Sequence, residues 1–326
     1  MLNFAALARA AHFRGPSATD SRPAASRVGL KEKETNMNRP ARITAFAAVL
    51  AGTVFYMSGC RQLEARDQLN KGVDAYKSAH YEEAIGHFQE ATRLDPTLPM
   101  AKTYLATALA QNVVPGMDTP DNLRTANQAI EIFKQVLAQN PNDVNSIKQV
   151  AGIYYSMASP SNQTAWLQDL QNAKEWQMKV LAVDPKDADA AYTIGVIDWN
   201  IAHENVLKAL QAAGFNDDGE GNVKVPKKIM EPVAQENAPL VEEALKYLNE
   251  AVADRPTYDD AMSYLNLVYR KKADVDYGHP TEVKDDLAEA QKWSADSMGT
   301  RKANEERKNK QATQGGIVMD ANGNMK

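Results

Sequence analysis

The apolar residues of the segment 65–96 recur at helical spacing, with small side chains at regular places among them. The pattern predicts two helices joined by a tight turn at His80. Asp95-Pro96 ends the second run, because proline cannot continue a helix and disfavours helix in the preceding residue. The positions that define the pattern are Gly72, Tyr81, Ala84, Phe88, Ala91 and Pro96.

The same pattern returns along the chain. Pro141, Pro185 and Pro256 each close a similar run, and a new helix is predicted to begin after each of them. Twelve positions before these prolines stand Ala129, Ala173 and Ala244. A fifth closing helix is predicted around Ala290 and Trp293.

This pattern resembles the tetratricopeptide repeat (TPR), a helix–turn–helix unit of about 34 residues. The resemblance covers 65–299 and implies an all-α, TPR-like helix-turn-helix solenoid of about five repeats. Small residues would let the two helices of each repeat, A and B, approach closely. Five repeats exceed the roughly three that a stable stack needs.

The chain departs from this family in its spacing, because the closing prolines lie 44 or more residues apart. The residues in excess of the family's repeat length fall between helices A and B. They predict insertions near 113–122, 158–167, 205–238 and 274–283. Equivalent turns of stacked repeats line up, so the insertions are expected to form one rim. In the longest, 205–214 continues a helix and 214–226 reads as a hairpin. The charged segment 300–326 is expected to be a partly disordered tail.

Residues 37–59 have the organisation of a secretory signal, with basic residues, an uncharged run and a small-residue exit. Met57-Ser58-Gly59-Cys60 resembles the lipobox of bacterial lipoproteins. That resemblance implies cleavage before Cys60, acylation of Cys60 with chains such as palmitate, and a lipidated linker over 60–64. An uncleaved membrane anchor is the alternative, since residues 43–60 just reach spanning length.

Residues 1–36 fit poorly before such a signal, because Met37 itself would start a normal basic region. We interpret them as a mis-called N-terminal extension, with an organelle transit peptide as the alternative. They are left out of the fold prediction.

Composition and charge narrow the function. The net charge of −5 gives no overall positive field for nucleic acid, so no nucleic-acid partner is predicted. The single cysteine rules out an intramolecular disulfide framework and a multi-cysteine zinc site. The sequence holds no glycine-rich phosphate loop and no Gly-x-Ser-x-Gly motif. Residues 216–222 lack the alternation of a calcium loop. We therefore expect a protein that is not an enzyme and has no metal or cofactor.

In the repeat family, helix A side chains line a concave groove that binds partners. Carried over by position, the resemblance assigns this role to Arg66, Tyr76, Lys77, Asn145, Lys148, Tyr155, Tyr192, Trp199, Asn200 and Arg270. Tyrosine and tryptophan commonly anchor interfaces. The alternative, weighed equally, is that Tyr76, Tyr155 and Trp199 pack against neighbouring helices.

Two further features bear on binding. Leu69 and Val73 stand where some relatives carry a Lys/Asn clamp for chaperone C-terminal carboxylates, so no binding of that kind is predicted. The loop rim, with Val113, Val114, Trp166 and Tyr277, is a rival binding surface.

The sequence thus predicts a membrane-anchored TPR scaffold or adaptor that binds a protein or peptide partner in the bacterial cell envelope. It would face the periplasm, and Arg61 after Cys60 favours the outer over the inner membrane. One alternative is a small-molecule or glycan-binding module that uses a cleft near 205–238. Another is a structural subunit that self-associates through the rim. The oligomeric state is left open.

Overall fold

The structure is a computed structural model that describes residues 60–315. The N-terminal extension, the signal segment 37–59 and residues 316–326 lie outside the described residues. Cys60, the first of the described residues, is exposed and has a free thiol.

Every regular element within residues 60–315 is a helix, which confirms the all-α fold class. The first helices of the pairs are residues 60–77, α3 (Pro99–Gln111), α5 (Val144–Met157), α7 (Ala188–Ala212) and α9 (Asp259–Val275). The second helices are α2 (Tyr81–Leu94), α4 (Pro120–Gln139), α6 (Gln163–Val183), α8 (Lys227–Asp254) and α10 (Pro280–Gly315). No helix among them is both long enough and apolar enough to span a bilayer.

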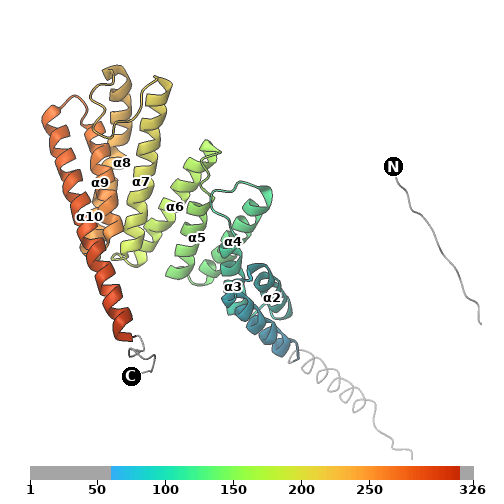
Figure 1. The fold of residues 1–326 in the computed structure, drawn as a ribbon. Coiled ribbons are helices and arrows are strands. Elements are labelled where there is room, and N and C mark those ends of the chain that lie inside the picture. The colour runs from blue at the N-terminus through green and yellow to red at the C-terminus, as the bar shows by residue number, and fades with distance from the viewer. Residues whose placement is uncertain (1–59, 316–326) are drawn as a thin grey trace, which may run out of the picture. The chain divides into compact units, whose positions relative to one another are not determined.

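The helices pack in chain order, as Figure 1 shows. From α2 to α10, each helix contacts the next, and first helices also meet across neighbouring pairs, as α3 does with α5 and α7 with α9. This consecutive packing of helix pairs is the arrangement of a TPR-like solenoid. The A and B helices of the sequence prediction are therefore those of the structure.

Small residues at the contacts set how closely the helices approach. The alanine at the equivalent place in each second helix is fully buried, at Ala84, Ala129, Ala173, Ala244 and Ala290. The facing first helices carry glycine at these contacts. A Cβ on Gly72 would lie only 2.5 Å from Cε1 of Phe88. Likewise, a Cβ on Gly195 would lie 2.5 Å from Cγ of Leu248. No other residue type fits these places without a shift of the ring or side chain opposite.

The predicted insertions lie between helices A and B, and each contains helical residues as well as a non-helical connection. The non-helical connections are only residues 112–119, 158–162, 213–226 and 276–279. The prediction of a hairpin at 214–226 is wrong, since residues 213–226 contain no strand. Gly219, Gly221 and Asn222 adopt positive φ there, and Asp217 and Asp218 accept backbone amide protons in place of cross-strand bonds.

Two pairs of connections are hydrogen-bonded to each other, whereas the single rim along all four stays a prediction. The Gly116 amide donates to Ser156 O at 2.8 Å, and Ser159 Oγ donates to Gly116 O at 2.7 Å. Gln163 Nε2 donates to Glu204 Oε1 at 2.6 Å. Tyr277 Oη donates to Val225 O at 2.6 Å. These bonds join the first connection to the second, and the third to the fourth.

The last helix runs past the boundary expected at residue 299 and ends at Gly315. Its extension is tied to the start of α9. Arg301 Nε donates to Asp259 Oδ2 at 2.8 Å, and Asn304 Nδ2 donates to Asp259 Oδ1 at 2.8 Å and to Thr257 O at 3.0 Å. These bonds hold a stretch that its charge alone would leave unpacked.

Candidate functional site

A pocket of about 430 Å³ opens among the first helices of the first three repeats. We call it the A-helix pocket. It is lined by Val73, Tyr76, Lys77, Phe88, Thr103, Tyr104, Thr107, Phe133, Asn145, Ser146 and Gln149. Of the residues predicted to bind a partner, the structure brings Tyr76, Lys77 and Asn145 together here.

Helix periodicity places these side chains. Asn145 and Gln149 are four residues apart on α5, and Thr103 and Thr107 are four apart on α3, so each pair shares one helix face. The floor comes from the second helices, through Phe88 of α2. The pocket therefore combines an apolar floor with hydroxyl and amide groups along its walls.

Phe88 and Phe133 also line the pocket. The sequence analysis used Phe88 only to define the repeat pattern, and it did not single out Phe133. Both are almost completely buried. The ring of Phe88 lies 5.7 Å, centroid to centroid, from that of Tyr104. The signal that could have found Phe88 was Gly72, because a glycine on one helix lets a large ring of the facing helix pack directly against its backbone.

Lys77 carries the only formal charge among the lining residues. It forms no ion pair or hydrogen bond with any other residue of the described part of the chain. Tyr76 is half-buried, and burial raises the pKa of its hydroxyl. The pocket thus has one cation at an otherwise uncharged lining.

A second group of predicted residues lies on α7 and its neighbours. The ring of Tyr192 lies 5.0 Å from that of Tyr258 and 5.6 Å from that of Tyr264. Trp199 meets Tyr264 edge-on at 5.4 Å and stacks on His203 at 4.9 Å. Burial raises the pKa of Tyr192. These rings pack mainly on one another. For Trp199, this agrees with the alternative that it packs against neighbouring helices.

The remaining predicted residues differ in how far they are engaged within the chain. Lys148 forms an ion pair with Asp187. Arg270 donates through Nη1 to Gly219 O at 3.0 Å and through Nε to Asn266 Oδ1 at 3.2 Å. Asn200 forms a side-chain hydrogen bond with the exposed Tyr155. Arg66 is exposed and does not line the pocket.

The rim that was named as a rival surface is largely used for internal contacts. Val113 is buried, Trp166 and Tyr277 are half-buried, and Val114 is exposed. The side chain of Asn122 closes the first connection, since it accepts from the Val114 amide at 2.8 Å and donates to Val114 O at 2.9 Å.

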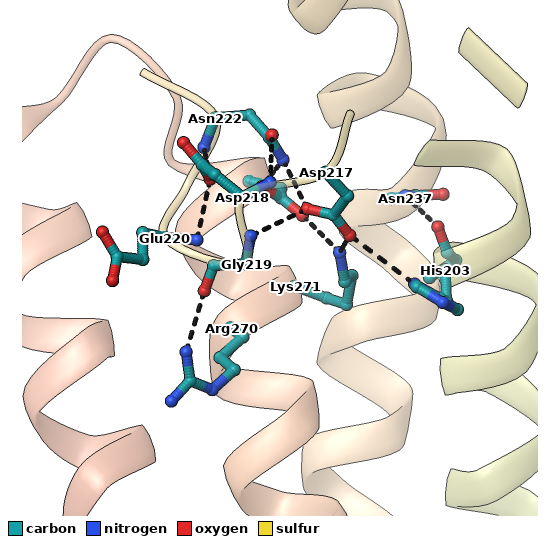
Figure 2. A network of polar contacts seen from close by, with 11 residues as sticks. His203, Asp217, Asp218, Gly219, Glu220, Asn222, Asn237, Arg270 and Lys271 are labelled. Carbon is teal, nitrogen blue, oxygen red and sulfur yellow. Dashed lines mark hydrogen bonds and ion pairs between the residues drawn. The ribbon is translucent and has the colours of Figure 1, made fainter. Parts of the chain in front are cut away.

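The connection 213–226 is fixed to α9 by a buried polar network, shown in Figure 2. Lys271 Nζ lies 2.7 Å from Asp217 Oδ2 and 2.8 Å from Asp274 Oδ2. Asn222 Nδ2 donates to Asp274 Oδ1 at 2.7 Å and to Asp217 Oδ1 at 3.0 Å. His203 Nδ1 lies 3.8 Å from Asp217 Oδ2. The charges that converge near 205–238 are thus paired with one another.

The pKa values in this network follow from burial and pairing. Burial works to lower the pKa of Lys271, but Asp274 and Asp217 outweigh it and the pKa is raised. Burial raises the pKa of Asp274. Burial opposes ionisation of Asp217 as well, yet Lys271 lowers its pKa below the ordinary value. Among the described residues, no three His, Cys, Asp or Glu side chains are grouped as a metal site.

Comparison with known proteins gives likenesses among solved structures alone. No model of a known protein family matches the chain, and no curated protein matches it significantly. It is similar to MamA (residues 41–end) from Desulfovibrio magneticus RS-1, with 16% identity over 74% of this chain and 96% of that one, and a TM-score of 0.47.

Two further solved structures are similar to the chain. YrrB, described as a TPR protein with an unusual peptide-binding site, has 13% identity over 73% of this chain and 90% of its own, with a TM-score of 0.41. TTC0263, a thermophilic TPR protein from Thermus thermophilus, has 19% identity over 63% of this chain and 98% of its own, with a TM-score of 0.34. Because these sequence identities and TM-scores are low, the assignment of the fold rests on the helix pairs of this chain itself.

Proposed function

We propose that this protein is a scaffold that binds an extended segment of a protein or peptide partner at the A-helix pocket, without catalysing a reaction. The observation that carries the proposal is the lining of that pocket. Aromatic and aliphatic groups there can bury a partner side chain, while threonine, asparagine and glutamine side chains can bond its main chain. Its volume is in the lower part of the ~300–1,000 Å³ range of ligand pockets.

Two exposed glycines allow a sharp test. Gly152 lies on α5, three residues beyond Gln149, and no atom lies within 4 Å of a Cβ placed on it. Gly86 lies on α2, on a second helix, and is equally open. We expect Gly152→Trp to obstruct the surface beside the pocket and to weaken partner binding at least tenfold. Gly86→Trp should leave binding unchanged.

The measurement is photo-crosslinking in cells. A photoreactive residue at Thr107, which lines the pocket, should capture a defined partner, and the same residue at Lys134 on α4 should not. Capture at Thr107 should disappear in the Gly152→Trp protein and persist in the Gly86→Trp protein. Equal capture from both positions, or no loss with Gly152→Trp, would contradict binding at this surface.

We further propose that Cys60 anchors the scaffold to a bilayer of the bacterial cell envelope, facing the periplasm and on the outer rather than the inner membrane. The support is the signal-like segment before Cys60 and the exposure of its thiol. Several acyl chains hold a protein durably, whereas one chain alone gives marginal binding. The pocket would then be displayed close to the membrane surface.

A further inference from the structure

The charge of the A-helix pocket has one source. Five of its lining side chains are aromatic or aliphatic, five are uncharged and polar, and Lys77 is the cation. Lys77 is exposed and has no internal carboxylate partner among the described residues. An ammonium group that is left unpaired beside an apolar pocket is available to an anionic group of a ligand.

The charged residues of the neighbouring first helices bear on the positive charge that Lys77 brings to the pocket. Neither α3 nor α5 contains an aspartate or glutamate; α3 carries Lys102, whereas Lys148 of α5 is already paired with Asp187. The acids of Lys77's own helix, Glu64, Asp67 and Asp74, do not line the pocket. By contrast, α7 carries Asp189, Asp198 and Glu204. The chain as a whole is acidic, at −5, so any attraction of an anion to this pocket is local.

We propose that the A-helix pocket selects a peptide in which a large apolar side chain has an acidic side chain two positions away. The apolar group would occupy the space above Phe88, and the carboxylate would pair with Lys77. This inference rests on the proposed function and adds the chemistry of the partner to it.

The spacing of two follows from the geometry of an extended chain. Successive side chains point to opposite faces, so residues i and i+2 share a face and are separated by roughly 6.5–7 Å. A carboxylate at that separation can meet the end of a lysine whose stem borders the pocket. An acid at the adjacent position would point away from it.

The test uses four short fluorescent peptides, acetylated and amidated so that no terminal charge interferes. Their central sequences are Asp-Ser-Phe-Ser-Asp, Asn-Ser-Phe-Ser-Asn, Lys-Ser-Phe-Ser-Lys and Asp-Ser-Ser-Ser-Asp. Acids on both sides make the result independent of the direction in which the peptide lies. Binding is measured by fluorescence anisotropy with the full-length protein in detergent micelles, and empty micelles are the blank.

We expect the acidic phenylalanine peptide to bind about 3- to 5-fold more tightly than its asparagine counterpart, the scale of an exposed ion pair. The advantage should shrink as salt is raised from 50 to 500 mM. Lys77→Met should abolish it, and Lys77→Glu should transfer the preference to the lysine peptide. Lys134→Glu on α4, with the same change in net charge, should leave the preference intact. Circular dichroism verifies that each variant is folded.

The outcomes separate this inference from the proposed function. If all phenylalanine peptides bind equally and Gly152→Trp blocks them, the surface binds peptides and the acidic preference is refuted. If Lys134→Glu acts like Lys77→Glu, the preference belongs to the overall charge and the assignment to Lys77 fails. If the peptide without phenylalanine binds as well as the one with it, the apolar part of the inference fails. If no peptide binds and Thr107 captures no partner in cells, the proposed function itself fails.

Discussion

At the scale of single residues, the contact between Gly72 and Phe88 decides both packing and the floor of the A-helix pocket. The first helix has no side chain at the point where the ring of Phe88 crosses it. The ring packs against that helix and also borders the pocket, although it is almost completely buried. One glycine thus serves stability and binding together.

Gly72→Ala should destabilise the protein even though alanine is the better helix former. The added methyl group would lie 2.5 Å from the ring, and overpacking of this kind costs about 1–3 kcal/mol. The helix-propensity gain is only about 0.5–1 kcal/mol. The matched control, Gly86→Ala, has open space around it and should raise the free energy of unfolding by that gain. Urea unfolding measures both, and equal effects of the two substitutions would refute the close-packing argument.

At the scale of elements, α6, α7 and α8 meet at a buried polar joint. Lys174 Nζ of α6 lies 2.6 Å from Asp198 Oδ1 of α7 and 2.7 Å from Glu243 Oε2 of α8. Asp198 is fully buried, and its Oδ2 has no hydrogen-bond partner within the described residues. Burial raises the pKa of Asp198 to about 6, although Lys174 opposes this.

We expect this joint to make the free energy of unfolding depend on pH. The folded state holds a proton on Asp198 more tightly than the unfolded chain does, whose aspartates titrate near ~3.9. The contribution therefore favours folding below about pH 4 and is lost as the pH rises through about 6. The free energy of unfolding of the native protein, relative to Asp198→Asn, should fall between pH 4 and pH 7 in urea titrations. A difference that stays constant over this range, or grows, would show that the ion pair with Lys174 dominates instead.

The ends of elements show what the sequence could and could not predict. The residues before the closing prolines end their helices in non-helical conformations, as local rules require. These residues are Asp95, Asn140, Asp184 and Arg255. Local rules do not predict the first half of α8, because they place a helix end before each proline, whereas Pro232 and Pro239 lie inside that helix. Tertiary contacts override them there: Met230 and Val233 are buried, and Asn237 Nδ2 donates to Ala202 O at 2.8 Å.

The same limit applies to the site and to the last helix. Position within the repeat predicted Tyr76, Lys77 and Asn145, which line the A-helix pocket. It could not show that Lys148 and Arg270 bond within the chain, because Asp187 and Gly219 are distant in sequence from them. The helix beyond 299 likewise depends on Asp259, a contact that no local pattern contains.

At the scale of the whole molecule, the proposed anchor is tested by removing it. Cys60→Ala should release the protein from membranes into the soluble fraction and abolish labelling by a fatty-acid analogue, because Cys60 is the only thiol. Fractionation and labelling of cells measure both effects. Continued membrane retention without label would indicate an uncleaved anchor over residues 43–60 instead.

The attachment of the connection 213–226 has a consequence for how the chain is made. Its closing partners, Lys271 and Asp274, belong to α9, which leaves the ribosome dozens of residues after the connection itself. Asp217 therefore lacks its lysine partner until the final repeat has been synthesised and has folded against its predecessor. A nascent or truncated chain that stops before α9 would expose this connection to proteases, and completion of the last repeat would protect it.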